Sequence, residues 1–187
     1  MARIVACCLA LLIAAPPLGA TGTKVAEPDG YWTGPINAEV PATIAGGEVI
    51  HARALSDLLA RERALIIDVS NVPRRPAEMM EGAPWLPLPH AGIPGSLWIP
   101  GAGLGAIPPK IDRYFRERLR KATADNLDHL IVIYCHERCW LSWNAARRAI
   151  EYGYRRVYWF PEGIEGWRPA GFDTSVVEAE EPVDAAG

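Results

Sequence analysis

The sequence lacks several features that would place it in a simple class. Its apolar N-terminal segment is shorter than the ~20 residues that a bilayer span needs. No basic stripe occurs and the formal net charge is −3, so the sequence argues against a nucleic-acid partner. No internal repeat is visible. What remains is a chain of 187 residues, 50% of them hydrophobic, which is large enough to bury one core without added staples.

The first 20 residues have the pattern of a secretory signal peptide. Arg3 supplies the charged start, Ile4 to Ala15 form the apolar segment, and residues 16–20 form a small-residue exit. We expect cleavage after Ala20 and a periplasmic protein with no membrane span in its mature chain. The alternative is an uncleaved anchor, which the short apolar segment disfavours. No small-residue box leads into a cysteine, so a lipoprotein anchor is not expected.

The two cysteines expected in the mature chain are too few for a disulfide scaffold in a domain of this size. Cys7 and Cys8 lie inside the expected signal peptide, which leaves Cys135 and Cys139 in the mature chain. In an oxidising compartment such a pair can form a disulfide. That disulfide would close so short a loop that it would remove little chain entropy. The spacing therefore favours chemistry over stapling.

Short apolar strands alternate with helical stretches in the predicted domain, residues 44–175. This alternation predicts an α/β domain with a mostly parallel central sheet and helices on both faces. An irregular arm (21–43) precedes the domain and a disordered acidic tail (176–187) follows it. Strands are predicted at 49–50, 64–69, within 90–100, at 130–134 and at 156–160, and helices at 52–63, 110–124 and 141–152.

Residues 70–109 hold most of the prolines of the chain and many of its glycines. A stretch of this length is too long for a plain connection between two elements. We therefore interpret it as a functional or partner-facing insertion.

Cys135 stands at the end of an apolar strand and just before a loop and a helix. The strand would fix the sulfur, while loop N–H groups and the helix N-terminus would favour thiolate over thiol. A thiolate at Cys135 could attack a disulfide or accept a persulfide, and Cys139 could resolve the product as an internal disulfide. The alternative for both residues is packing as small hydrophobic side chains. The residues expected to shape the substrate-binding loop are His136, Glu137, Arg138 and Trp140.

Other chemistries need residues that the loop does not have. A zinc site would need a second pair of ligands beside the two cysteines and His136, and none has matching spacing. Covalent haem attachment needs a histidine where Trp140 stands. A phosphate-transfer loop needs an arginine at the position of Leu141 to clamp phosphoryl oxygens. We therefore expect no metal, no cofactor and no phosphatase activity.

Alternatives remain open for the side chains around this loop. His136 could lower the pKa of the thiol or point to solvent, and Arg138 could contact an anion or be a surface charge. Asp68, at the end of a predicted strand, is expected to orient loop backbone in a supporting role. His90 could face the site from the insertion or be exposed. Trp140, Trp143, Trp159 and Trp167 could form an aromatic rim for a ligand, although core packing is the commoner use.

Four stretches of the chain resemble, in order, the marks of the rhodanese-like (sulfurtransferase) family. They are Leu-Ile-Ile-Asp68-Val, Ala-Gly-Ile-Pro-Gly95-Ser-Leu-Trp-Ile-Pro, Ile-Val-Ile-Tyr-Cys135, and Val157-Tyr-Trp-Phe-Pro-Glu-Gly163-Ile-Glu-Gly-Trp. The resemblance spans roughly residues 49–172. It implies a rhodanese-like fold in which Cys135 carries a sulfane sulfur as a persulfide and passes it to a nucleophile.

Within that family the chain is most similar to exported proteins named for PQQ-dependent catabolism and a Cys-Xaa-Xaa-Cys-Trp (CXXCW) motif. Here three residues rather than two separate Cys135 and Cys139, with Trp140 following. The resemblance implies a periplasmic quinoprotein alcohol dehydrogenase or a c-type cytochrome as partner. It also implies a small sulfur compound or a protein thiol as substrate.

The loop departs from that of typical sulfurtransferases, because it has no glycine, one arginine and a bulky Trp140, and Glu137 opposes anion binding. Thiosulfate is therefore a doubtful substrate. Two hypotheses follow. In the first, the protein performs periplasmic sulfur or thiol–disulfide chemistry. In the second, it is a binding module or chaperone that has kept the fold and lost turnover.

Overall fold

The computed structural model describes residues 25–180, which form a five-stranded sheet between two layers of helices. All neighbouring strands of this sheet are parallel, in the order β1-β6-β5-β2-β4. The predicted α/β architecture is therefore confirmed. The strands are β1 (Glu48–Val49), β2 (Leu65–Asp68), β4 (Leu97–Trp98), β5 (Ile131–Tyr134) and β6 (Val157–Phe160), and the helices are α1 (Ala52–Arg61), α2 (Pro109–Thr123), α3 (Trp140–Glu151) and α4 (Gly163–Trp167).

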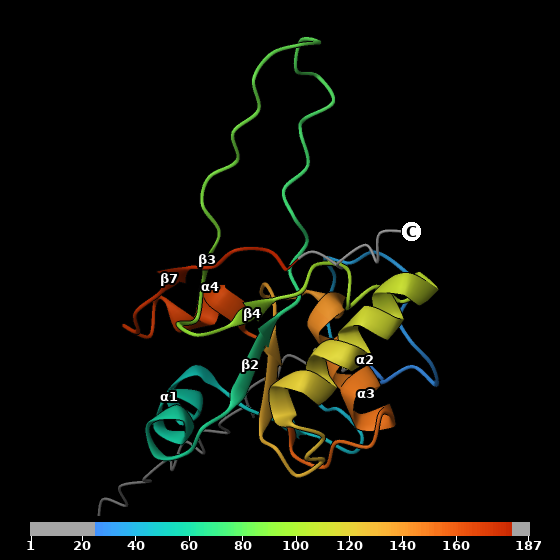
Figure 1. Ribbon diagram of the computed structural model, residues 1–187, viewed down its shortest axis with the longest axis vertical. Coiled ribbons are helices and arrows are strands. Elements are labelled where there is room, and N and C mark those ends of the chain that lie inside the picture. The colour runs from blue at the N-terminus through green and yellow to red at the C-terminus, as the bar shows by residue number, and fades with distance from the viewer. Residues whose placement is uncertain (1–24, 181–187) are drawn as a thin grey trace, which may run out of the picture.

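Helices cover both faces of the sheet, as predicted (Figure 1). On one face α2 and α3 pack through buried side chains such as Phe115 and Ala146, together with Ile133 of β5. On the other face α1 and α4 pack through Leu55 and Ile164. Strands β2 and β5 are buried along almost their whole length, because a central parallel strand is covered on both sides.

The carboxyl ends of β2 and β5 lie at the same edge of the sheet. Asp68, the last residue of β2, is in register with Tyr134, the last residue of β5. The backbone N–H of Val69 donates to the Tyr134 carbonyl oxygen at 3.0 Å, which continues the pairing past the strand ends. Whatever follows these two strands is therefore held side by side.

The end of the described chain differs from the prediction of a disordered tail from residue 176. A second, two-stranded sheet pairs β3 (Ala91–Gly92) with β7 (Ser175–Val176) in antiparallel fashion. Val177 is buried, and Glu180 binds Arg118 of α2. Hydrogen bonds and a buried valine hold residues 176–180 in place, whereas residues 181–187 and the expected signal peptide lie outside the described residues.

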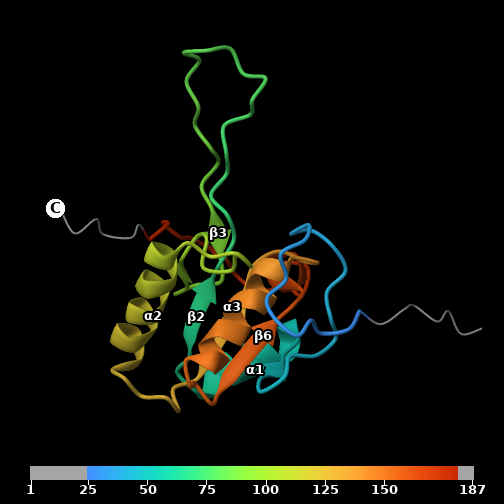
Figure 2. The same ribbon diagram turned by 90° about the vertical axis from the view of Figure 1, so that its right-hand side faces the viewer.

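Two irregular segments lie outside the sheet and its helix layers (Figures 1 and 2). Residues 71–89 project away from the body as a long loop, referred to here as the 71–89 arm. The described part of the predicted N-terminal arm, residues 25–43, lies beside α3 instead (Figure 2). Within residues 25–180, no helix is both long and apolar enough to cross a membrane.

Candidate active site

The turn from β5 to α3 holds both cysteines of the described chain. Cys135 follows the last residue of β5, and Cys139 is the N-cap of α3, with φ −120° and ψ 117°. Between them Arg138 adopts a left-handed backbone conformation with φ 53°. This left-handed residue lets the five-residue loop 135–139 connect β5 directly to α3.

Both thiols are free and buried, with Cys135 0% and Cys139 2% exposed. The Cys135 thiol lies 3.4 Å from the backbone carbonyl oxygen of Cys139, to which it can donate. Ser142, in the first turn of α3, also donates its hydroxyl to that carbonyl, at 3.3 Å. The two cysteines and the start of α3 therefore form one hydrogen-bonded cluster.

The two thiols differ in acidity. A hydrogen bond from Cys135 lowers the pKa of Cys139 to about 7, and the backbone N–H groups of Leu141 and His136 act in the same direction. Burial raises the pKa of Cys135 well above its ordinary value. The prediction that helix and loop N–H groups stabilise a thiolate agrees with this geometry, but at Cys139. The expectation of an ionised, reachable sulfur at Cys135 disagrees with it, because that side chain is fully enclosed.

The N-terminal arm covers the cysteine loop on one side. The backbone N–H of Ala38 donates to the carbonyl oxygen of Arg138 at 3.0 Å, and that of Trp140 donates to Ile36 at 2.9 Å. The Trp32 ring stacks on Trp140 with centroids 4.4 Å apart. The arm thus lies against the loop like an added antiparallel strand, with Asn37 opposite Cys139.

Asn144 on α3 fixes the arm in this position. Its side-chain amide donates to the carbonyl oxygen of Trp32 at 3.0 Å and accepts the Trp32 N–H at 2.9 Å. A cavity of about 230 Å³ lies at this junction and is lined in part by Ile36, Trp140 and Asn144. The cavity touches the first turn of α3 beside the cysteines.

Helix α4 covers the loop on the other side. The N–H of Ile164 donates to the Cys135 carbonyl oxygen at 3.1 Å. Gly163 has φ +56°, and a Cβ there would lie 2.3 Å from the same carbonyl oxygen. Only glycine fits both the conformation and the space. Gly163 was part of the predicted motif, and this contact is the physical reason for it.

His136 and Arg138 of the loop each contact an acidic side chain. His136 lies 2.9 Å from a Glu165 carboxylate oxygen, and the Glu137 N–H donates to the other oxygen of that carboxylate at 3.0 Å. Arg138 pairs with Glu39 of the arm at 2.7 Å. The Glu165 carboxylate thus accepts a hydrogen bond from a loop N–H that would otherwise be available to an anionic substrate. This arrangement agrees with the doubt about thiosulfate.

Sequence reasoning missed Glu165 and Trp32, both of which touch the loop. Glu165 lay within a recognised motif, but nothing in its spacing identified the loop as its partner. Trp32 lies in the predicted irregular arm, where the sequence has no period that points to a partner.

Asp68 binds the backbone that follows β2 and the side chain of His90. Its buried carboxylate accepts the backbone N–H of Ser70 at 2.8 Å and lies 2.8 Å from His90 Nε2. The His90 ring stacks on Trp98 with centroids 3.9 Å apart. His90 is therefore mostly buried against this pair, which disagrees with the alternative of an exposed loop residue.

Asp68 and Cys135 belong to opposite faces of the sheet. Tyr134, in register with Asp68, packs in the core beneath α1 and α4. Cys135 packs in the core beneath α2 and α3. The structure therefore does not bring Asp68 into the cysteine cluster.

The tryptophans near the motif pack in the core and do not form an exposed aromatic rim. Trp140, Trp143, Trp159 and Trp167 are all buried. Among residues 25–180, no group of three or more His, Cys, Asp or Glu side chains is placed to hold a metal ion.

A comparison with protein families assigns the fold. The model of the rhodanese-like domain matches residues 51–170, more than half of the chain. The chain belongs to the rhodanese-like domain family. The predicted rhodanese-like fold is thereby confirmed, with the cysteine loop at the carboxyl end of a central strand. No curated protein sequence matches this chain.

Solved structures with a similar fold share little sequence with this rhodanese-like protein. One is a thiosulfate sulfurtransferase from Pseudomonas aeruginosa, at 20% identity and TM-score 0.46, covering 71% of this chain and 21% of that one. Another is YnjE, at 19% identity and TM-score 0.44, covering 71% and 33%. An uncharacterized protein from Saccharomyces cerevisiae has 15% identity and TM-score 0.41, covering 66% and 92%. The chain spans about a fifth of the length of the Pseudomonas protein.

Proposed function

We propose that this rhodanese-like protein performs thiol chemistry with Cys135 and Cys139, either thiol–disulfide exchange or persulfide transfer. The observation that carries the proposal is one hydrogen-bonded cluster of two free thiols at the start of α3, with the pKa of one lowered to about 7. A purely structural pair of buried cysteines would not need helix N–H groups directed at sulfur.

The acidity of the two thiols sets the order of events. In exchange with a disulfide R–S–S–R′, the Cys139 thiolate attacks one sulfur and displaces R′–S⁻, leaving Cys139–S–S–R. The Cys135 thiol then gives its proton to R′–S⁻ and attacks the Cys139 sulfur. R–S⁻ leaves, and a Cys135–Cys139 disulfide remains. The two cysteines lose two electrons, and the substrate disulfide gains them.

Persulfide transfer uses the same first thiolate. Cys139 attacks the outer sulfur of a donor R–S–SH, releases R–S⁻ and keeps the sulfane sulfur as Cys139–S–SH. This order reverses the roles that the sequence suggests, in which Cys135 carries the sulfur and Cys139 resolves it. The reversal rests on the raised pKa of Cys135 and the lowered pKa of Cys139, since both side chains are buried.

The substrate class is inferred from the charges at the loop. Glu165 lies against His136 and accepts the Glu137 N–H, and Glu39 pairs with Arg138. An anion such as thiosulfate would meet these carboxylates at close range. A neutral small persulfide or disulfide, or a cysteine of another protein, therefore fits the site better.

The cellular setting follows from the sequence resemblance. We propose a periplasmic protein, released by cleavage after Ala20, that supports PQQ-dependent alcohol oxidation. Its partner would be a quinoprotein alcohol dehydrogenase or its c-type cytochrome, whose maturation or protection needs thiol chemistry.

Intact-mass analysis of the protein purified from its own compartment tests the chemistry. Alkylation with and without prior reduction separates three states. A loss of two hydrogens indicates the internal disulfide, and an added sulfur indicates the persulfide. Two unmodified thiols under every condition would contradict both forms of the proposal.

Single variants test the order of the two thiols. We expect Cys135→Ser, incubated with a small disulfide such as oxidised glutathione, to accumulate a stable mixed disulfide on Cys139. We expect Cys139→Ser to form far less adduct. The opposite result would restore Cys135 as the first nucleophile.

A second candidate function is a binding module or chaperone for the same kind of partner. The burial of both thiols, at 0% and 2% exposure, favours it. A Cys135→Ser/Cys139→Ser double variant separates the two functions in cells. A binding module keeps its in vivo role when the thiols are lost, whereas the thiol enzyme loses it with the fold intact.

A further inference from the structure

The 71–89 arm carries most of the exposed large apolar side chains of the described chain. Leu86 and Leu88 are each 88% exposed, Met80 80% and Val72 47%. Trp85 is partly exposed on the same segment. Only two residues outside the arm, among residues 25–180, belong to this class. So much apolar surface held away from the body indicates a contact site for another molecule.

The arm is not an extension of a sheet. In the described chain, no backbone hydrogen bond joins its two legs, residues 71–75 and 84–89. The second leg contains Pro84, Pro87 and Pro89, which have no N–H to donate. It therefore cannot add to a partner by regular strand pairing, which also argues against arm exchange between two copies of this chain.

The spacing of the prolines suits a different conformation. Pro84-Trp-Leu-Pro87 places two prolines three residues apart, the repeat of the polyproline II helix. Segments of this kind are recognised by grooves lined with aromatic side chains. Leu86 and Leu88, on the same leg, supply apolar surface to fill such a groove.

The tip of the arm is held by its own contacts. The Arg75 guanidinium donates to the carbonyl oxygen of Ala83 at 3.2 Å and also to that of Met80. The N–H of Ala83 donates to Met80 at 3.0 Å, and that of Met79 donates to Pro76 at 3.2 Å. These bonds close residues 75–83 into a loop, so part of the ordering cost of binding is already met.

The charge of the arm indicates which kind of partner it can bind. Arg74 and Arg75 are balanced by Glu78 and Glu81. A segment that bound anionic lipid or nucleic acid would need an excess of basic residues. Apolar contact with a protein is therefore the mode that this composition supports.

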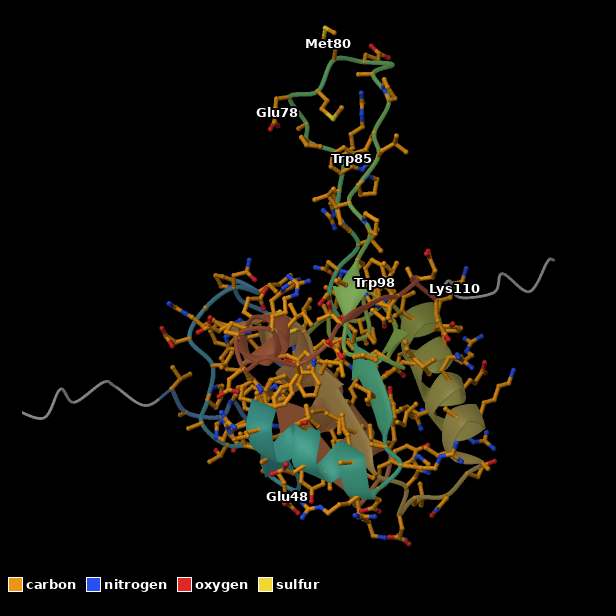
Figure 3. All side chains as sticks on the ribbon, turned by 90° about the vertical axis from the view of Figure 1, so that its left-hand side faces the viewer. Glu48, Glu78, Met80, Trp85, Trp98 and Lys110 are labelled. Atoms are coloured by element: carbon orange, nitrogen blue, oxygen red, sulfur yellow. The ribbon has the colours of Figure 1, made fainter. Side chains whose placement is uncertain are left out.

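We propose that the 71–89 arm docks into an aromatic-lined groove on another folded protein, with residues 84–89 inserted as a polyproline II segment. The arm starts three residues after Asp68, whose strand pairs with the strand that ends in Cys135. Figure 3 shows Trp85 partway along the arm and Met80 at its far end. A partner held there sits over the sheet edge that carries the cysteine loop. The docking does not depend on whether the cysteines react.

The test begins with a photo-crosslinking amino acid at Leu88 of the full chain, expressed in its native cells. A matched control carries the same group at exposed Val176 of β7. We expect one adduct that is specific to position 88 and contains a protein of different sequence. That protein, purified, is then titrated with the full chain.

Two variants and one competitor decide the outcome. Leu86→Ser/Leu88→Ser should weaken binding roughly tenfold or more, because two leucines lose their burial. Val72→Ser, on the opposite leg, should change binding less than about twofold. A synthetic peptide of residues 83–90 should compete. An adduct with a second copy of this chain, with lipid, or no adduct above the Val176 control would overturn the proposal, as would binding that neither variant changes.

Discussion

At the scale of single residues, burial and hydrogen bonding separate the acidities of the two thiols. The Cys135 S–H is enclosed by protein, so removing its proton would bury a charge. The Cys135 side chain and the backbone N–H groups of Leu141 and His136 instead lower the pKa of Cys139. Cys139 can therefore be thiolate near neutral pH, while Cys135 remains protonated.

This difference predicts the pH profile of the reduced protein. Because the pKa of Cys139 is lowered from the ordinary range of a cysteine thiol to about 7, its thiolate is present above pH 7 and is lost as pH falls below it. We expect the alkylation rate of Cys135→Ser, in which serine keeps the hydrogen bond, to rise through a midpoint near pH 7. Iodoacetamide labelling followed by mass analysis between pH 5 and pH 10 measures this.

The matched control is Cys139→Ser, which leaves only the enclosed Cys135. Its labelling should remain slow until well above the ordinary pKa of a cysteine, because burial raises the pKa of Cys135. A midpoint near pH 7 in this variant, instead of in Cys135→Ser, would reverse the assignment.

Asp68 shows how a supporting residue is tested through stability. Its buried carboxylate binds the Ser70 N–H and His90. Asp68→Ala leaves both partners without an acceptor, and we expect it to lower the free energy of unfolding by about 2–4 kcal/mol. Urea unfolding measures the loss, with exposed Asp57→Ala as control. A loss no larger than that of the control would show that the pair contributes little.

At the scale of elements, the N-terminal arm limits access to the cysteine loop. Trp32 covers Trp140, and Asn144 binds both backbone groups of Trp32. We expect Trp32→Ala to increase the alkylation rate of the thiols by roughly tenfold, since losing the stacked ring favours local opening of the arm by at least 1.4 kcal/mol.

Arg147→Ala provides the control for that variant. Arg147 holds the same arm through the carbonyl oxygens of Pro28 and Asp29, several residues before the loop contact. Its effect on alkylation should be smaller than that of Trp32→Ala. Equal acceleration in both variants would mean that the whole arm opens together, and no acceleration in either would mean that the thiols are reached by another route.

The elements that the sequence predicted correctly are those with a strong local signal. Residues 130–134 and 64–67 are unbroken apolar runs, and such runs are sufficient to predict buried strands at the centre of a parallel sheet. The same holds for α2, with its apolar stripe. The order of strand, cysteine loop and helix also follows from adjacent residues. Local pattern is sufficient for these features.

The features that were missed depend on contacts between residues far apart in the sequence. Strands β3 and β7 have two residues each, too few to show a period. The cover that residues 36–38 provide over the loop, and the Glu165 contact with His136, join segments that no local rule relates. The acidity of Cys139 depends on how the loop folds, because the fold places the Cys135 side chain and the N–H groups of Leu141 and His136 at its sulfur. The order of strand, cysteine and loop alone favours Cys135 as the thiolate.

At the scale of the whole molecule, hydrogen bonds hold residues 25–43 and 175–180 against the body of the domain, whereas the 71–89 arm projects from it. Residues 175–180 cross the top of the sheet. The Val177 N–H donates to His90 at 2.9 Å, the Glu180 N–H donates to Trp98 at 2.7 Å, and the Glu180 carboxylate accepts from Tyr114 at 2.9 Å. Among residues 25–180, the hydrogen bonds of the arm all join residues within the arm itself.

Two deletions should therefore change the free energy of unfolding by very different amounts. Replacing residues 72–88 with a short Gly-Ser linker removes exposed surface and shortens a loop, so we expect the free energy of unfolding to change by less than about 1 kcal/mol. Ending the chain at Thr174 uncovers the site of Val177 and removes the partner of Arg118, so we expect a loss of about 2–4 kcal/mol. Urea unfolding of both variants beside the full chain measures the difference. If removing the arm cost as much as removing residues 175–187, the arm would be a structural part of the domain, and its exposed leucines would need no partner to explain them.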